Sequence, residues 1–402
     1  MNYVAKVGTP QNKLEDNEAV IVSAVRTPVG RAFKGSLKEV RPDDLAGFAI
    51  KKAVERVPGL DPHQIEDVIL GCANPEGEQG YNVARNAALL AGLPASVPGV
   101  TVNRFCSSGL QAITFAAQQI ILGTGEVYVA GGTEASSRVP EQGVRAFRPN
   151  PKFVEREQSG MPDVYISMGL TAENVANRFG VSRQTQDEFA LASQMKAVKA
   201  QREGWFDDEI VPYTLDNGIV VSKDDGPRAS TTREALAALQ PVFIEGGSVT
   251  AGNSCPLNDG AAAIVIMSLG KARELGLKPM ARIVSWSVSG IAPEIMGVGP
   301  IQAVTKLLQR TGLSIEDIDI FELNEAFASQ AYEVCHQLGV DIDRQLNPKG
   351  GAIALGHPFG CTGARIMATL LNGLRQFDKQ LAIETMCVGG GQGYATLVER
   401  LN

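Results

Sequence analysis

Apolar residues along this chain occur in two patterns that alternate with each other. Short continuous runs, rich in β-branched residues, are typical of buried strands, and longer stretches with apolar residues every three or four positions are typical of helices. Within residues 1–132 the continuous runs predict strands buried in a sheet at 19–25, 67–71, 97–102 and 127–130. The periodic stretches predict helices that begin near Pro42 and that span 82–92 and 110–121. This alternation indicates an α/β layered sheet.

The helix near Pro42 has recognisable end signals. Asp43 or Asp44 is well placed as its N-cap, because an aspartate oxygen can accept a hydrogen bond from a free amide of the first turn. Gly59 is expected to end it, since glycine readily adopts the left-handed conformation that follows a helix.

The stretch from 133 to 247 has a different character. Its apolar runs are fewer, its prolines are frequent, and it contains one amphipathic helix, expected over 171–199. We therefore predict an insertion, after which the sheet resumes with a strand at 258–267.

The last third of the chain repeats the first. Four pairs of segments correspond at an offset of about 250 to 260 residues, a self-similarity typical of a duplicated unit. The pairs are 19–23 with 281–285, 66–71 with 317–322, 106–111 with 360–365, and 128–132 with 385–390. Two duplicated α/β halves packed face to face would bring the starts of their helices to one shared cleft.

These patterns divide the chain into three parts. Residues 1–132 together with 248–279 are expected to form the first α/β half, and 280–402 the second. Residues 133–247 are expected to form an inserted loop domain between them.

Composition excludes several classes of protein. The chain has 402 residues, enough for two or three domain-sized units, and its net charge of -7 argues against nucleic acid as a partner. Neither a signal peptide nor a membrane span is expected, because residues 1–19 are polar and acidic and no apolar run is long enough. Six scattered cysteines and three histidines form no disulfide framework or zinc motif, so no metal site is expected. A reduced, cytoplasmic protein fits best.

Cys106 lies where a predicted strand turns into a helix. The unpaired amides at a helix start carry about half a positive charge, which can lower a thiol pKa from ~8.5 to between ~3.5 and ~7.5. We therefore expect an available thiolate at Cys106. For a lone cysteine, a small buried residue is the commoner case.

Three stretches of the second half contain candidate partners for this thiol. Asn324 follows a strand and opens a helix, His357 lies in a glycine-rich stretch before the repeated helix, and Cys387 ends a strand before 389–391. A histidine can take the thiol proton, and amide groups can hold an oxyanion. All of these groups could converge on the shared cleft.

The chain resembles the thiolase family over nearly its whole length, from about Ala19 to Leu401. The resemblance rests on four motifs in order: NRFCSSGLQA, NEAFA, GGAIALGHPFGCTGAR and CVGGGQG. It implies the thiolase fold, with duplicated βαβαβαββ halves in a five-layer αβαβα arrangement and an inserted loop domain on the coenzyme A side.

The resemblance also implies a two-step mechanism. Cys106 would be the acylated nucleophile, His357 its base, and Cys387 the group that exchanges a proton with the incoming thiol or with the Cα of acetyl-CoA. Asn324, through a water, would join His357 in one oxyanion hole. The backbone amides of Cys106 and Gly389 would form the other.

Binding roles follow from the same resemblance. Arg228 would contact the CoA nucleotide, and Cys255 occupies a position where a serine commonly bonds pantetheine, with Ser254 beside it. Met168 and Met296 would line the acyl pocket, although either could equally be ordinary core. Lys349 stands where a small polar residue is usual, and we expect little effect from it.

Ser167-Met168-Gly169 resembles the degradative members of the family. We therefore predict thiolysis of 3-ketoacyl-CoA in fatty-acid β-oxidation, with acetyl-CoA C-acetyltransferase activity as the alternative. A decarboxylating condensing enzyme and a non-catalytic lipid-binding relative are weaker alternatives. CoA and acyl-CoA would be substrates, with no permanently bound cofactor. A homodimer or homotetramer is expected, and the family leaves room for a hydratase/dehydrogenase partner.

Overall fold

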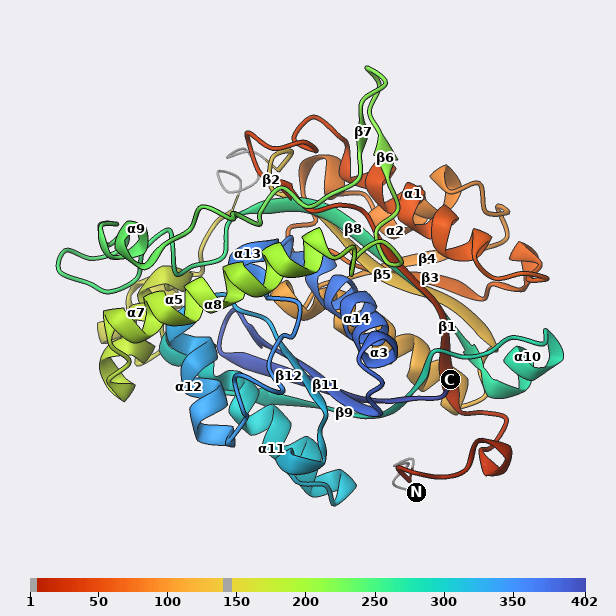
Figure 1. Cartoon of the computed structure of the whole chain (residues 1–402). Coiled ribbons are helices and arrows are strands. Elements are labelled where there is room, and N and C mark those ends of the chain that lie inside the picture. Colours follow the sequence, from red (N-terminus) through yellow and green to blue (C-terminus); the bar gives the residue numbers. More distant parts are fainter. Residues whose placement is uncertain (1–5, 140–146) are drawn as a thin grey trace.

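One continuous hydrogen-bonded sheet forms two layers, a first sheet and a second sheet from the two halves of the chain, and these enclose a pair of buried helices (Figure 1). The computed structural model describes residues 6–139 and 147–402, so residues 140–146 of the predicted insertion lie outside the described residues. The first half contains β1 (Ala19–Arg26), β2 (Gly30–Arg31), α1 (Pro42–Glu55), β3 (Asp67–Gly71), α2 (Val83–Leu90), β4 (Gly99–Val102), α3 (Ser108–Ile121), β5 (Val127–Ala135), β8 (Asn258–Ser268) and α10 (Leu269–Glu274).

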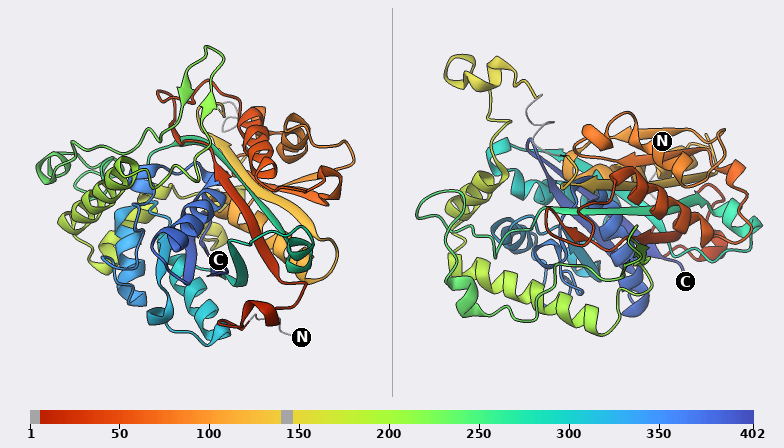
Figure 2. Two further views of the ribbon diagram at one scale, coloured as in Figure 1. Left: turned by 45° about the vertical axis from the view of Figure 1, so that its right-hand side comes forward. Right: turned by 90° about the horizontal axis from the view of Figure 1, so that it is seen from above.

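The second half and the intervening stretch complete the chain. The second half contains β9 (Ala281–Gly290), α11 (Gly299–Thr311), β10 (Ile320–Leu323), α12 (Ala328–Leu338), α13 (Ala352–Leu355), α14 (Phe359–Gln376), β11 (Leu381–Val388) and β12 (Gln392–Arg400). Between β5 and β8 lie α5 (Pro151–Val154), α6 (Arg156–Ser159), α7 (Met168–Phe179), α8 (Arg183–Arg202), β6 (Tyr213–Thr214), β7 (Val220–Val221) and α9 (Arg233–Ala237). In the right-hand view of Figure 2, α5 and α6 stand away from the rest of the chain.

Strand pairing confirms the duplication. In the first half β3 runs parallel to β5, β5 antiparallel to β8, and β8 antiparallel to β1. In the second half β10, β11, β12 and β9 have the same order and the same directions. The counterpart of β4 is reduced to a bridge between Phe321 and Leu346. The two sheets join where Val20 and Ile21 of β1 pair with β9.

The layers follow the pattern αβαβα, as expected. Helices α1 and α2 cover the outer face of the first sheet, α3 and α14 lie between the sheets, and α11 and α12 cover the outer face of the second (Figure 1). The central apolar cluster contains residues of both sheets and of both buried helices, for example Ile264, Met386, Leu110 and Leu370. Full burial of each such side chain stabilises the fold by about 1.5–3 kcal/mol.

Helices α3 and α14 approach each other at two glycines. A Cβ on Gly363 would lie 2.2 Å from the backbone nitrogen of Leu110, and one on Gly109 would lie 2.8 Å from that of Ala364. A side chain larger than hydrogen therefore cannot be accommodated without shifting a helix. The contact brings the starts of α3 and α14, and hence residues of both halves, to the same place.

Several sequence expectations about element ends are wrong. Helix α1 has Arg41 as its N-cap, because Pro42 already suits the first helical position; Asp43 in the first turn binds the Arg41 side chain instead. The helix ends at Glu55, before Gly59. The strand expected at 97–102 is shorter and is not buried, because β4 is the last strand at one end of the sheet.

The single helix expected over 171–199 is two helices. Gly180 ends α7 in the left-handed conformation, with φ +71°, and Ser182 caps α8 by accepting a hydrogen bond from the amide of Thr185 at 3.1 Å. Helices α7 and α8 share one amphipathic pattern, so the sequence pattern does not reveal the break between them. Among the residues described, no helix is long and apolar enough to span a membrane.

Candidate active site

Cys106 lies in a tight turn, Phe105–Ser107, between β4 and α3. Phe105 has φ +44°, a conformation that is rare for a bulky residue and persists where surrounding contacts hold it. Ser108 supplies those contacts: its hydroxyl donates to the carbonyl of Phe105 at 2.6 Å and accepts from the amide of Arg104 at 2.9 Å. The turn places the thiol at the start of α3, as the sequence predicts.

His357 and Asn324 come together from different parts of the second half. Asn324 follows β10 directly, and His357 lies in the loop between α13 and α14; both are buried. Asn324 Nδ2 lies 3.3 Å from His357 Nε2. The backbone amide of His357 donates to Asn258 Oδ1 at 2.9 Å, which fixes the loop against the first half.

Thr362, in the first turn of α14, determines which ring nitrogen of His357 carries the proton. Its hydroxyl donates to the carbonyl of Pro358 at 2.9 Å, so its oxygen accepts from His357 Nδ1–H at 2.7 Å. Nε2 is therefore an acceptor that faces the Asn324 amide. The sequence analysis missed Thr362, although a hydroxyl residue one turn beyond a loop histidine is a recognisable signal.

The ionisation of the two central groups differs from the prediction. Burial raises the pKa of the Cys106 thiol to about 11, although hydrogen bonds from the amides of Gly389 and Cys106 itself act in the opposite direction. Burial, with the nearby Arg365 guanidinium, lowers the pKa of His357 to about 3. The prediction of a thiolate at Cys106 is wrong, because desolvation raises the thiol pKa by more than the helix start lowers it. Both shifts favour a neutral thiol and a neutral imidazole.

Cys387 and Gly389 complete the set at the end of β11. Cys387 is fully buried, and burial raises its pKa well above the usual range, with the Cys106 and Cys255 thiols contributing further. The Gly389 amide hydrogen-bonds the Cys106 sulfur across the boundary between the halves. The sulfur of one half thus meets an amide of the other.

Glu134, at the end of β5, is a buried carboxylate that the sequence analysis missed. It accepts hydrogen bonds from the amides of Ala73 and Gly360, each at 2.8 Å, and from Gln79 Nε2 at 2.6 Å. Gly360 belongs to the first turn of α14, so a carboxylate of the first half holds the helix start beside His357. Its position at the edge of the predicted insertion gave no indication of this role.

Arg228 and Ser254 line a cavity of about 290 Å³ that Arg31 also lines. Burial and the charge of Arg31 lower the pKa of Arg228, so the two guanidinium groups lie near each other. Among the residues described, neither side chain pairs with a carboxylate. Two unpaired like charges in one cavity make a site for a polyanionic group.

Cys255, Met168 and Met296 do not line that cavity. They pack with Cys387 and Phe327 in a separate small apolar cluster. The Cys255 amide donates to the carbonyl of Ala326 at 3.0 Å, which ties this cluster to the loop after Asn324. The region thus has a cationic cavity on one side and an apolar lining around Cys387 on the other.

A lysine at position 349 was expected to have little effect, but Lys349 belongs to a buried network of charged side chains. It is fully buried, with Nζ 3.1 Å from the carbonyl of Trp205 and 3.5 Å from Glu209 Oε2. Glu209 in turn binds Arg26 at 2.8 Å, and Arg26 binds Asp224 at 2.8 Å. This buried chain of charges connects the segment between β5 and β8 to both halves.

Duplicated halves with a cysteine, a histidine, an asparagine and a second cysteine at their junction define a class of cysteine-dependent acyl-transfer enzymes. The family model described as "Thiolase, N-terminal domain" matches residues 19–270, and "Thiolase, C-terminal domain" matches residues 277–400. The chain belongs to the thiolase family.

Three similar proteins illustrate the family. A 3-ketoacyl-CoA thiolase of Bacillus subtilis (strain 168) is 48% identical over 394 residues, which cover 95% of this chain and 99% of that protein. The crystal structure of the Bacillus anthracis acetyl-CoA acetyltransferase has a TM-score of 0.88 and 43% identity, with 100% of both chains covered. The dimeric peroxisomal thiolase of Saccharomyces cerevisiae has a TM-score of 0.90 and 39% identity, with 97% of this chain and 99% of that chain covered.

Proposed function

We propose that this protein cleaves 3-ketoacyl-CoA with CoA, forming acetyl-CoA and a shortened acyl-CoA, as a step of fatty-acid β-oxidation. The observation that carries the proposal is the arrangement of His357, which donates its Nδ1 proton to Thr362 and presents Nε2 to Asn324. His357 lies on the loop before α14, and α14 packs against the turn of Cys106. Similarity to the Bacillus subtilis 3-ketoacyl-CoA thiolase supports it.

In the first step the Cys106 sulfur attacks the 3-keto carbon while His357 Nε2 takes the thiol proton. The bond between C2 and C3 then breaks, leaving the acyl group on Cys106 and an acetyl-CoA enolate, which takes a proton from Cys387. The buried Cys387 thiol is suited to this role because its high pKa keeps the proton in place until the carbanion develops.

In the second step a CoA thiol gives its proton to Cys387 and attacks the thioester at Cys106. The acyl group leaves as acyl-CoA, and the Cys106 sulfur recovers its proton from His357. The amides of Cys106 and Gly389, which bind the sulfur in the free enzyme, can bind the thioester oxyanion, and Asn324 with His357 can bind the enolate oxygen. Each such donor contributes about 3 kcal/mol to the barrier reduction.

Residues 133–247 form the coenzyme A side in this proposal. The cationic cavity of Arg228 and Arg31 suits the phosphates of the nucleotide, and Ser254 on its wall suits the pantetheine arm. Cys255, with Met168 and Met296, belongs to the lining of the acyl side around Cys387. The division into residues 1–132 with 248–279, 133–247 and 280–402 is part of the same proposal.

A homodimer is proposed as the assembly, with a homotetramer as a pair of such dimers. Strand β4 is the end strand of the sheet, and Val100 on it is 41% exposed beside Tyr81, which is 96% exposed. An apolar edge strand is a template for pairing with another chain. The yeast relative, described as dimeric, supports the assignment. We also propose that the protein acts in the cytoplasm, where a hydratase/dehydrogenase partner can associate with it.

A second candidate is acetyl-CoA C-acetyltransferase activity on acetoacetyl-CoA, favoured by the Bacillus anthracis structure. Thiolysis rates with a four-carbon and with ten-carbon and longer 3-ketoacyl-CoA substrates separate the two. Comparable or faster cleavage of the longer chains supports β-oxidation, and activity confined to four carbons supports the alternative.

Mass spectrometry after mixing with acetyl-CoA tests the shared mechanism. An acetyl adduct on the peptide containing Cys106, absent from Cys106→Ala, is the expected result. Thiolysis that survives Cys106→Ala would refute the mechanism. Activity that requires malonyl-CoA would indicate a decarboxylating condensing enzyme, and lipid binding without any adduct would indicate a non-catalytic relative.

A further inference from the structure

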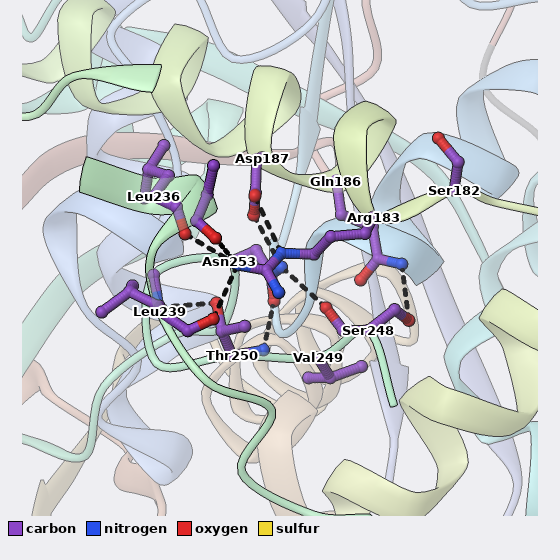
Figure 3. A network of polar contacts seen from close by, with 12 residues as sticks. Ser182, Arg183, Gln186, Asp187, Leu236, Leu239, Ser248, Val249, Thr250 and Asn253 are labelled. Carbon is purple, nitrogen blue, oxygen red and sulfur yellow. Dashed lines mark hydrogen bonds and ion pairs between the residues drawn. The ribbon is translucent and has the colours of Figure 1, made fainter. Parts of the chain in front are cut away.

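Arg183, in the first turn of α8, bonds the segment of Leu236 and Leu239, which forms one wall of the Arg228 cavity (Figure 3). Arg183 Nη2 donates to the carbonyl of Leu236 at 2.7 Å and to that of Leu239 at 2.9 Å. Leu236 and Leu239 both line the cavity, whereas Arg183 does not. The guanidinium therefore supports the wall without reaching its inner surface.

The same guanidinium is connected to a second part of the cavity lining, the loop 250–254. Arg183 Nε donates to Asp187 Oδ2 at 2.8 Å, and Asp187 Oδ1 accepts from Asn253 Nδ2 at 3.0 Å. The other end of the Asn253 amide accepts from the backbone nitrogen of Thr250 at 2.8 Å. Figure 3 shows Asn253 between Asp187 and Thr250. These bonds close the loop 250–254, which supplies Ala251, Gly252 and Ser254 to the cavity.

Neither wall is strongly held by its own secondary structure. Helix α9 has five residues, too few to be stable on its own. The Leu239 amide donates to the Leu236 carbonyl at 3.1 Å, and that oxygen can accept a second hydrogen bond. Arg183 supplies donors for the carbonyl of Leu236 and for that of Leu239 just beyond the helix. The loop 250–254 contains no regular element, and Asn253 is fully buried at its centre. Leu236 and Leu239 pack against Gly252, and the Arg183 fork, through Asp187 and Asn253, ties both walls to the first turn of α8.

We propose that Arg183 and Asp187 are positioning residues for coenzyme A. They hold α9 and the loop 250–254 against the first turn of α8, so they raise the affinity for CoA without touching it. A guanidinium suits this task because its donors have a fixed geometry, which a lysine cannot reproduce. The inference rests on the proposed function, since it requires CoA to occupy this cavity.

The test compares Arg183→Lys and Arg183→Met with the wild-type enzyme in thiolysis. We expect the KM for CoA to rise roughly tenfold, about 1.4 kcal/mol, while kcat at saturating CoA stays within about twofold. Acylation of Cys106 by a short thioester that lacks the nucleotide should keep its rate. Asp187→Asn, which keeps the shape but loses one acceptor for the fork, should raise the KM by a smaller factor.

The control is Arg202→Met, because Arg202 lies on the same helix with its side chain 72% exposed. It should change neither KM nor kcat. A purely structural effect of Arg183 would lower the unfolding temperature and the amount of active enzyme at an unchanged KM, and that result would overturn the inference.

Calorimetric titration with CoA separates this inference from the proposed function. If wild-type enzyme binds CoA, Arg228→Ala binds it weakly and Arg183→Lys binds it as tightly as wild type, the inference alone fails. If wild-type enzyme does not bind CoA at all, the proposed function fails and this inference with it.

Discussion

His357 Nδ1 lies 2.7 Å from Thr362 Oγ1, and this contact determines which nitrogen of the ring is free to act as a base. The threonine proton is already engaged by the carbonyl of Pro358, so the oxygen can only accept. With Nδ1 protonated, Nε2 faces the Asn324 amide as a lone pair. The tautomer is thus set by a side chain that touches no reacting atom.

Replacement of Thr362 by valine should lower kcat by roughly 100-fold, the low end of what a positioned base contributes. Valine has a similar shape but no acceptor, so the Nδ1 proton loses its partner and the other tautomer becomes competitive. Steady-state thiolysis across pH measures the effect. Thr362→Ser keeps the hydroxyl and should retain most of the activity; an equal loss in both variants would mean that packing, not the tautomer, is responsible.

Alkylation of Cys106 by iodoacetamide should accelerate steadily with pH. Because the thiol pKa is raised to about 11, the thiolate fraction below that pH grows about tenfold per pH unit. Peptide mapping at pH 6, 7, 8 and 9 isolates the Cys106 signal from those of Cys255 and Cys387. A rate that is constant between pH 6 and 8 would instead indicate a preformed thiolate–imidazolium pair.

Glu322 should make the protein less stable as the pH rises. Burial raises its pKa from about 4.5 to about 8, although Arg365 and Lys349 partly oppose the shift. Between these values the folded state binds more protons than the unfolded state, so stability falls with increasing pH. Glu322→Gln removes this dependence, and calorimetric unfolding at pH 5, 6, 7 and 8 should show the variant gaining relative to wild type. As a control, substitution of the exposed Glu316 by glutamine should give the same difference in stability from wild type at all four pH values.

Lys349→Met should lower the free energy of unfolding by about 3 kcal/mol, near the lower limit for breaking a buried ion pair. The substitution leaves Glu209 fully buried with Arg26 and Thr369 as its remaining partners. Chemical denaturation measures the loss. Lys38→Met, at a side chain that is 45% exposed, is the control and should change stability by less than about 0.5 kcal/mol.

Val100→Glu should weaken self-association. The charge would lie on the open edge of β4, where pairing of two copies would bury it without a partner. Sedimentation at several protein concentrations should show a shift towards monomer. Ile219→Glu, at a residue 58% exposed before β7, should leave the assembly unchanged. If both variants sediment as wild type, β4 is not the interface.

The sequence predicts the layers and the duplication well because both are expressed in local periodicity. The strand of 19–25 and its repeat at 281–285 lie where the pattern places them, as do the helices that begin after Cys106 and near Gly360. The break at Gly180 is missed because two helices can share one apolar stripe. The pKa of Cys106 is predicted in the wrong direction because desolvation depends on what the other half places over the thiol.

Prediction of the candidate site from the sequence also succeeds where the signal is local and fails where it depends on distant contacts. Cys106, His357, Asn324 and Cys387 are found from motifs, because each lies at the end of an element whose neighbours are small. Thr362 and Glu134 are not found, since their roles consist of contacts with distant partners: an imidazole on a preceding loop and an amide of the other half. Local signals predict the candidate reacting groups, and the fold adds the residues that hydrogen-bond them or hold their elements in place.

The backbone contact of Gly109 with the start of α14 has a consequence for how activity arises as the chain folds. In the proposed mechanism, the first half folded alone would have a nucleophile without a base, and the second half alone a base without a nucleophile. A chain with two folded but separate halves would show native secondary structure and no turnover. Recovery of activity during refolding therefore reports the docking of the halves rather than the formation of either one.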